Sequence, residues 1–177
     1  MLSAETQGEV LDQMITNTGD SLRMAAAKSP VLLVFLRHFG CVFCREALSD
    51  ISKRRKEIES TGTRIVFVHM TDNDIAERYF SRYDLENVIH ISDPDCTFYR
   101  AFGLLKGNFN QLFGLHSWIR GFSVMAAGHS AGPQLGDGFQ MPGVFVIQNG
   151  EIRESFIHKL SSDRPDYEEL LKCCVLD

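Results

Sequence analysis

Three apolar runs divide the first half of the chain. Residues 31–37 read VLLVFLR, residues 64–70 read RIVFVHM, and residues 87–92 read NVIHIS. Continuous apolar runs of this length, rich in Val, Ile and Phe, predict strands that are buried on both faces of a sheet. The stretch 44–62 has apolar residues three or four apart and predicts an amphipathic helix. The stretch 71–84 opens with several N-cap candidates and predicts a second helix.

The remaining segments complete an alternating pattern. Residues 92–104 predict a turn and a short helix, and residues 165–174 predict a last helix with Pro165 in its first turn. Residues 141–158 predict a hairpin, because Asn149-Gly150 is a strong hairpin turn signal. Strands that alternate with helices and end in a hairpin predict an α/β fold with a mixed central sheet and helices on both faces.

The domain organisation follows from the same pattern. Residues 1–27 are expected to be an N-terminal extension with one short helix. Residues 28–177 are expected to form a single domain, with an insertion at about 105–140. Within the insertion, the amphipathic stretch 112–122 (LFGLHSWIRGF) predicts a helix that packs on the core or docks a partner.

Composition narrows the partners and the compartment. The 177 residues are 44% hydrophobic and 23% charged, which is ordinary for a folded domain. A net charge of -5 argues against nucleic-acid binding, and the basic run at 53–56 is expected to be a solvated helix face. No secretory signal is evident, and no run approaches the roughly 20 apolar residues of a membrane helix. We therefore expect a cytoplasmic protein without nucleic-acid or membrane partners.

Cys41 and Cys44 form a C-x-x-C motif between the first strand and the following helix. This spacing is found in zinc sites, iron–sulfur sites and redox dithiols. Metal is disfavoured because the histidines are scattered and the other close pair, Cys173-Cys174, is adjacent and unsuited to holding one ion. We therefore expect neither a metal nor a cofactor. A helix N-terminus stabilises a thiolate, which favours the redox dithiol, and two buried structural cysteines remain the alternative.

The residues around the motif resemble a known superfamily. VLLVFLRHFGCVFCREAL resembles the active-site strand, turn and helix of thioredoxin-fold proteins, and MPGVFVIQNGEI resembles their cis-proline segment. ISDPDCTFYRAFGL resembles a peroxiredoxin segment. Over about residues 28–175 the chain is similar to the peroxiredoxin-like AhpC/TSA superfamily, including its selenoprotein-L-like redox branch. The resemblance implies a thioredoxin-like fold with a cis Met141–Pro142 peptide facing Cys41, and a free Met141 backbone that binds substrate.

The sequence departs from the peroxiredoxin pattern at the reactive site. The reactive peroxiredoxin cysteine falls on Cys44, the Thr of that motif falls on Cys41, and its Pro falls on Arg37. The peroxidase arginine falls near Pro142. These departures favour Cys41 as the nucleophile and Cys44 as the resolving thiol. Arg37 and Arg45 are candidates for a substitute charge.

The function expected from these residues is that of an antioxidant thiol-disulfide oxidoreductase. The alternatives are a thiol-dependent peroxidase and a non-catalytic redox sensor on the same fold. His38 and Arg45 are candidate charges that favour the thiolate and contact substrate. The expected partners are a disulfide or peroxide substrate and a thiol electron donor, and a dimer is one option for the assembly. Cys96 is expected to be inert, and Cys173 and Cys174 to be incidental or to pair between chains.

Overall fold

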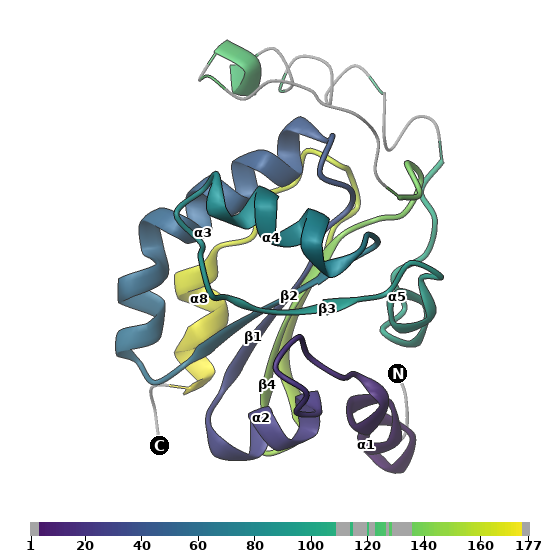
Figure 1. Ribbon diagram of the computed structural model, residues 1–177, viewed down its shortest axis with the longest axis vertical. Coiled ribbons are helices and arrows are strands. Elements are labelled where there is room, and N and C mark those ends of the chain that lie inside the picture. The colour runs from purple at the N-terminus through teal and green to yellow at the C-terminus, as the bar shows by residue number, and fades with distance from the viewer. Residues whose placement is uncertain are drawn as a thin grey trace.

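A five-stranded mixed sheet forms the centre of the computed structural model (Figure 1). The structure describes residues 4–108, 114, 120, 123–126, 128 and 136–174. The strands are β1 (Val31–Phe35), β2 (Arg64–His69), β3 (Ile89–Ser92), β4 (Gly143–Gln148) and β5 (Glu151–Ile157), in the order β3-β2-β1-β4-β5. β1, β2 and β3 are parallel, and β4 is antiparallel to β1 and β5. The predicted α/β fold with a mixed sheet is confirmed.

Helices cover both faces of the sheet. They are α1 (Ala4–Gln13), α2 (Leu22–Lys28), α3 (Val42–Ser60), α4 (Asn73–Ser81), α5 (Thr97–Ala101) and α8 (Tyr167–Leu171), which continues into a 3₁₀ turn at Lys172–Cys174. Successive β1 side chains point to opposite faces of the sheet. Leu32 and Val34 pack with α3, α4 and α8, whereas Leu33 and Phe35 pack with α1, α2 and α5 (Figure 1).

The N-terminal segment contains two helices instead of the expected one. Leu11 of α1, Met14 after it, and Leu22 of α2 are fully buried. They lie in the same part of the core as Leu33 and Phe35. The Ser21 hydroxyl accepts a hydrogen bond from the Met24 N–H at 3.3 Å and caps α2. The segment therefore covers a face of the sheet. The boundary at residue 27 between an N-terminal extension and the main domain remains a prediction.

Turn residues define the C-terminal part of the fold. Asn149 and Gly150 both have positive φ angles, 54° and 79°, as a tight hairpin between β4 and β5 requires. The last helix begins later than expected, at Tyr167, because the Asp166 carboxylate accepts the Glu169 N–H and caps it. Pro165 therefore precedes the helix cap and does not lie in the first turn.

Tyr99 of α5 fixes the chain where β1 ends. Its hydroxyl donates to the carbonyl of Leu36 and lies 3.1 Å from that of Val68. The Leu36 N–H also donates to the Val68 carbonyl at 2.9 Å. Two neighbouring parallel strands are thus tied together at their carboxyl ends, immediately before the C-x-x-C turn.

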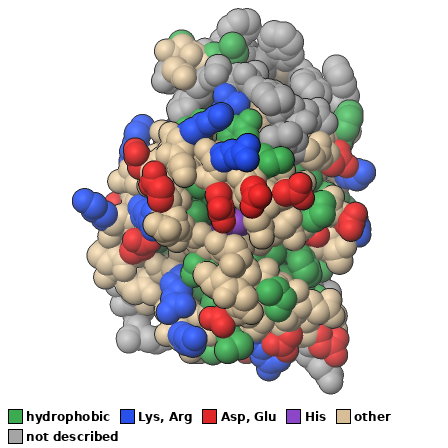
Figure 2. Space-filling view, viewed as in Figure 1, with side chains coloured by type: hydrophobic (Ala, Val, Ile, Leu, Met, Phe, Trp, Pro, Cys, Tyr) green, Lys and Arg blue, Asp and Glu red, His purple; other side chains and the backbone are tan. Residues whose placement is uncertain are grey.

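The surface in Figure 2 carries acidic, basic and apolar side chains side by side. On this face the basic side chains are scattered among the acidic ones and do not form one large patch. Among the described helices, none has both the length and the apolar character that crossing a bilayer demands.

Two histidines are buried side by side in β2 and β3. His69 Nε2 lies 2.9 Å from His90 Nδ1, and both residues are 1% exposed. The Thr71 N–H donates to His69 Nδ1 at 3.4 Å. Because that nitrogen accepts, His69 carries its proton on Nε2 and donates it to His90. Burial, assisted by the neighbouring His90, lowers the pKa of His69 to about 3.

We expect this pair to make the fold sensitive to acid. An unfolded His69 takes up a proton below pH ~6.5, whereas the folded residue stays neutral until about pH 3. The stability contributed by neutral His69 is therefore present above pH ~6.5 and is lost as the pH falls, by up to ~1.4 kcal/mol per pH unit. Urea unfolding between pH 7.5 and 5 should show a smaller decrease in the His69→Gln variant. Equal decreases in both proteins would contradict the prediction.

Candidate redox site

The two cysteines of the motif lie at the N-terminus of α3, as the sequence predicted. Cys41 is the N-cap residue, with an extended backbone (φ -75°, ψ 128°), and Cys44 lies in the first turn. The Cys41 N–H donates to the His38 carbonyl at 3.0 Å, which closes the turn after β1. Cys41 and Cys44 are 6% and 5% exposed, and both are free thiols.

Arg37 contacts both sulfur atoms. Its Nη1 donates to Cys41 Sγ at 3.2 Å, and its backbone N–H donates to Cys44 Sγ at 3.2 Å. The other guanidinium nitrogens donate to the Gly138 carbonyl, with Nε at 3.1 Å. The side chain is buried, so its positive charge faces Cys41 with little screening by water.

The pKa values of the two thiols are shifted in opposite directions. A hydrogen bond with the Cys44 thiol and the Arg37 charge together outweigh burial and lower the pKa of Cys41 to about 6. The same hydrogen bond, together with burial, raises the pKa of Cys44 well above its usual value. At neutral pH Cys41 is therefore mainly a thiolate. Cys44 stays protonated, and its S–H can donate a hydrogen bond to the Cys41 sulfur.

Arg45 and His38 have other environments than expected. Arg45 donates its Nε to the Phe39 carbonyl at 2.9 Å, and its guanidinium lies 5.9 Å from the centre of the Tyr79 ring. Burial and the Arg37 charge lower the pKa of His38 to about 4. His38 is consequently neutral at pH 7 and does not supply the positive charge proposed from the sequence.

The Met141–Pro142 peptide is trans, so the expectation of a cis bond is wrong. The Met141 N–H donates to the Leu105 carbonyl at 3.4 Å, and its own carbonyl accepts from Gln140 Nε2 at 3.3 Å. These bonds hold the segment within the fold, and the Met141 backbone is not free to pair with a substrate. Trans is also the less costly state of an X-Pro bond.

A cleft borders the cysteines. Its lining combines apolar side chains with charged ones, and the charged ones include Arg37 beside Cys41. It is formed by Val34, Phe35, Leu36, Arg37, Cys41, Phe43, Cys44, Glu46, Ala47, Asp50, Pro142, Val144, His158, Ser161, Asp163, Arg164, Pro165 and Tyr167. Of the substrate-binding residues expected from the sequence, Pro142 lines this cleft, whereas Met141, His38 and Arg45 do not.

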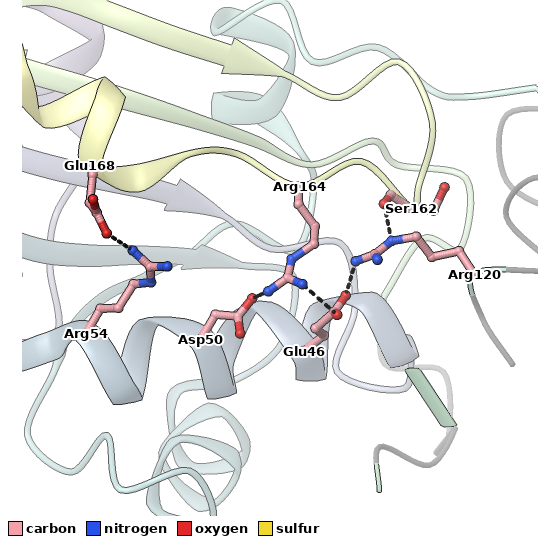
Figure 3. Close-up of polar contacts among 7 residues, drawn as sticks. All are labelled: Glu46, Asp50, Arg54, Arg120, Ser162, Arg164 and Glu168. Carbon is pink, nitrogen blue, oxygen red and sulfur yellow. Dashed lines mark hydrogen bonds and ion pairs between the residues drawn. The ribbon is translucent and has the colours of Figure 1, made fainter. Parts of the chain in front are cut away.

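Ion pairs hold the segment 158–165, here called the strap, against the start of α3 (Figure 3). Arg164 of the strap pairs with Glu46, at 3.3 Å, and with Asp50. Arg120 donates to the Glu46 carboxylate at 2.8 Å and to the Ser162 carbonyl at 3.0 Å. Glu46 is only 14% exposed in its side chain, so these contacts are partly shielded from solvent and close one side of the cleft.

Cys96 has the environment of an unreactive thiol. It is buried, and its Sγ lies 3.3 Å from Met70 Sδ. Burial raises the pKa of this thiol.

The predicted helix 112–122 falls almost wholly outside the described residues, which include Gly114 and Arg120 of that stretch.

Sequence reasoning placed Cys41 and Cys44 together at the start of a helix. It named Arg45 and His38 as the charges beside the thiolate, and Arg37 only as a substitute charge for a peroxide. It missed the Gly138 carbonyl that orients Arg37, and the strap. A cation directly after a buried strand was the signal for Arg37. The strap left no comparable signal, because Arg164 and its partners Glu46 and Asp50 are more than a hundred residues apart in the chain.

The fold and site together define a thioredoxin-like protein with a paired-cysteine turn. The AhpC/TSA antioxidant enzyme family matches residues 50–159, and the chain belongs to that family. The match begins after Cys44, so the family assignment rests on the sheet and helices that follow the motif. The finer assignment to a selenoprotein-L-like branch remains a prediction.

Two relatives and two solved structures show the range of similar proteins. The chain is 26% identical over 157 residues to the Arabidopsis thaliana thioredoxin-like protein AAED1, chloroplastic, covering 81% of this chain and 61% of that protein. It is 24% identical over 164 residues to a Danio rerio prostamide/prostaglandin F synthase, covering 89% and 81%. Reduced Prx3 from Vibrio vulnificus in complex with H₂O₂ superposes with a TM-score of 0.62, 15% identity and coverages of 88% and 86%. Peroxiredoxin Q from Xanthomonas campestris superposes with a TM-score of 0.57, 16% identity and coverages of 81% and 78%.

Replacing Arg37 should raise the pKa of Cys41. In Arg37→Gln the positive charge beside the sulfur is lost, and we expect an increase of about 1 unit or more. The rate of iodoacetamide alkylation as a function of pH, measured in a Cys44→Ser background, reports this value. Arg45→Gln is the matched control and should leave the pKa nearly unchanged. An equal increase in both variants would contradict the assignment to Arg37.

Loosening the strap should expose Cys41. In a Glu46→Gln, Asp50→Asn double variant, Arg164 loses both anionic partners, and alkylation of Cys41 at pH 8 should become several-fold faster. Glu168→Gln is the control. Glu168 of α8 pairs with Arg54 of α3 in a similar ion pair, but neither residue lines the cleft beside the cysteines. Unchanged alkylation in the double variant would show that the strap does not limit access.

Proposed function

We propose that this protein is a thiol-disulfide oxidoreductase in which Cys41 attacks and Cys44 resolves. The observation that carries the proposal is the position of Cys41 Sγ, 3.2 Å from a buried guanidinium at a helix N-terminus. A nucleophilic thiol must be ionised near neutral pH, and both features stabilise the thiolate. Membership of the AhpC/TSA antioxidant family supports redox chemistry in general.

The proposed cycle has two steps. The Cys41 thiolate attacks one sulfur of a substrate disulfide, forms a mixed disulfide and releases the other sulfur as a thiolate. Cys44 then loses its proton and attacks Cys41 Sγ. The second substrate thiolate leaves, and a Cys41–Cys44 disulfide forms. The substrate is reduced by two electrons, and a thiol electron donor restores the dithiol. A reducing compartment such as the cytoplasm is proposed, because it supplies such donors.

Peroxide reduction is the second candidate, and the Arg37 contact favours it. In this reaction the Cys41 thiolate attacks one oxygen of a hydroperoxide, giving a sulfenic acid and an alkoxide that is protonated to the alcohol. Cys44 then displaces water from the sulfenic acid and forms the same disulfide. Arg37 lies where it can stabilise the developing oxygen charge.

Serine substitutions should distinguish the two cysteines. Cys41→Ser should abolish turnover of insulin disulfides and of hydroperoxides, because the thiol that Arg37 Nη1 contacts is the proposed nucleophile. Cys44→Ser should permit attack and then stop, trapping a mixed disulfide or a sulfenic acid on Cys41 that mass spectrometry detects. Turnover should be measured with a dithiol reductant for insulin and by peroxide loss for cumene hydroperoxide.

The two assays also separate the candidate functions. Turnover of insulin with slow peroxide consumption supports the disulfide reductase, and the reverse supports the peroxidase. If Cys41→Ser retains activity while Cys44→Ser is inactive, Cys44 is the attacking thiol and Cys41 the resolving one. Wild-type protein that is inactive in both assays would overturn the enzymatic proposal and leave the redox sensor.

A further inference from the structure

Cys173 and Cys174 form a second pair of thiols, separate from the C-x-x-C site. They occupy the 3₁₀ turn at Lys172–Cys174, which follows α8 near the end of the described chain. Their Sγ atoms lie 3.6 Å apart, neither residue is in a disulfide, and both are half-buried. The sulfur atoms of the two adjacent thiols therefore contact each other.

Adjacent cysteines are poorly placed for a disulfide with each other. A disulfide needs a sulfur–sulfur distance of about 2.05 Å and a dihedral near 90°. Between adjacent residues it would also close a small ring through the peptide bond, and the helical turn would have to open. The Cys173 thiol donates to the Leu170 carbonyl at 3.2 Å, which ties this sulfur to the preceding helical turn.

The separation does suit a single atom bound by both sulfurs. Two bonds of about 2.3 Å at a roughly tetrahedral angle, as in zinc thiolates, separate the sulfurs by about 3.8 Å. The observed 3.6 Å is close to this value. Within the described residues, no group of three or more His, Cys, Asp or Glu residues is arranged to hold a metal ion. The pair thus offers two ligands and suits a centre that forms only two bonds to protein.

We propose that Cys173 and Cys174 form a binding site for a trivalent thiophilic centre, of the class of monosubstituted arsenicals. Both As–OH groups of R–As(OH)₂ exchange for sulfur, two As–S bonds form, and two molecules of water leave with the two thiol protons. Arsenic stays trivalent, so no oxidant or reductant is required. Soft sulfur ligands favour such a centre over hard cations. The proposal is independent of the reaction proposed for Cys41.

Phenylarsine oxide is a suitable probe, because in water it supplies one trivalent arsenic with two exchangeable positions. The full-length Cys41→Ser, Cys44→Ser variant removes the other dithiol and leaves Cys96, Cys173 and Cys174 as thiols. We expect intact-protein mass spectrometry to show one phenylarsenic per chain, with the loss of two thiols by titration. Excess glutathione should not remove the adduct, whereas 2,3-dimercaptopropanol should.

Single serine variants of the pair test the geometry. In the same background, Cys173→Ser or Cys174→Ser leaves one bond to arsenic, and retention against glutathione should fall by at least about a hundredfold because the second, intramolecular bond is lost. Cys96→Ser is the control and should not change retention. Circular dichroism confirms that each variant is folded. No adduct in the starting variant, or equal retention in all the single variants, would overturn the proposal.

Discussion

The contact between Arg37 and the Cys41 sulfur is the interaction on which the site depends. A guanidinium taken out of water is costly unless an anion or several acceptors surround it. Here the acceptors are the Cys41 sulfur and the Gly138 carbonyl, which Arg37 reaches from the end of β1. The arginine thereby connects the C-x-x-C turn with the segment that leads into β4. The hydrogen bond between the two thiols, rather than this charge alone, moves their pKa values in opposite directions.

The sheet explains why this contact can form. β1 is the third of the five strands and pairs with β2 on one side and β4 on the other. The chain leaves β1 at Phe35 and enters β4 at Gly143, and these two residues are register partners. The turn before α3 and the approach to β4 therefore meet at one end of the sheet. Tyr99 fixes the same end from the opposite face by binding the Leu36 carbonyl.

Local pattern was sufficient for much of this fold. The runs at 31–37 and 64–70 are strands, the Asn149-Gly150 turn forms the hairpin, and Cys41 begins a helix. Each of these depends on residues close together in the chain. The orientation of Arg37 depends on Gly138, 101 residues away, and no local pattern encodes such a contact. Met141 likewise pairs through its N–H with the distant Leu105, and the Met141–Pro142 bond is trans, whereas the family resemblance indicated cis.

The buried position of Arg37 has a consequence for the direction of electron flow. When Cys41 and Cys44 are joined as a disulfide, Cys41 loses its negative charge and the guanidinium keeps only neutral acceptors. The reduced state is therefore the one that the surrounding charge stabilises, so Arg37 lowers the driving force with which the proposed dithiol reduces a substrate disulfide. The oxidised protein should accept electrons more readily than a C-x-x-C pair without a neighbouring cation. In the proposed cycle, the group that activates the thiol for attack thus also makes its disulfide easier to reduce.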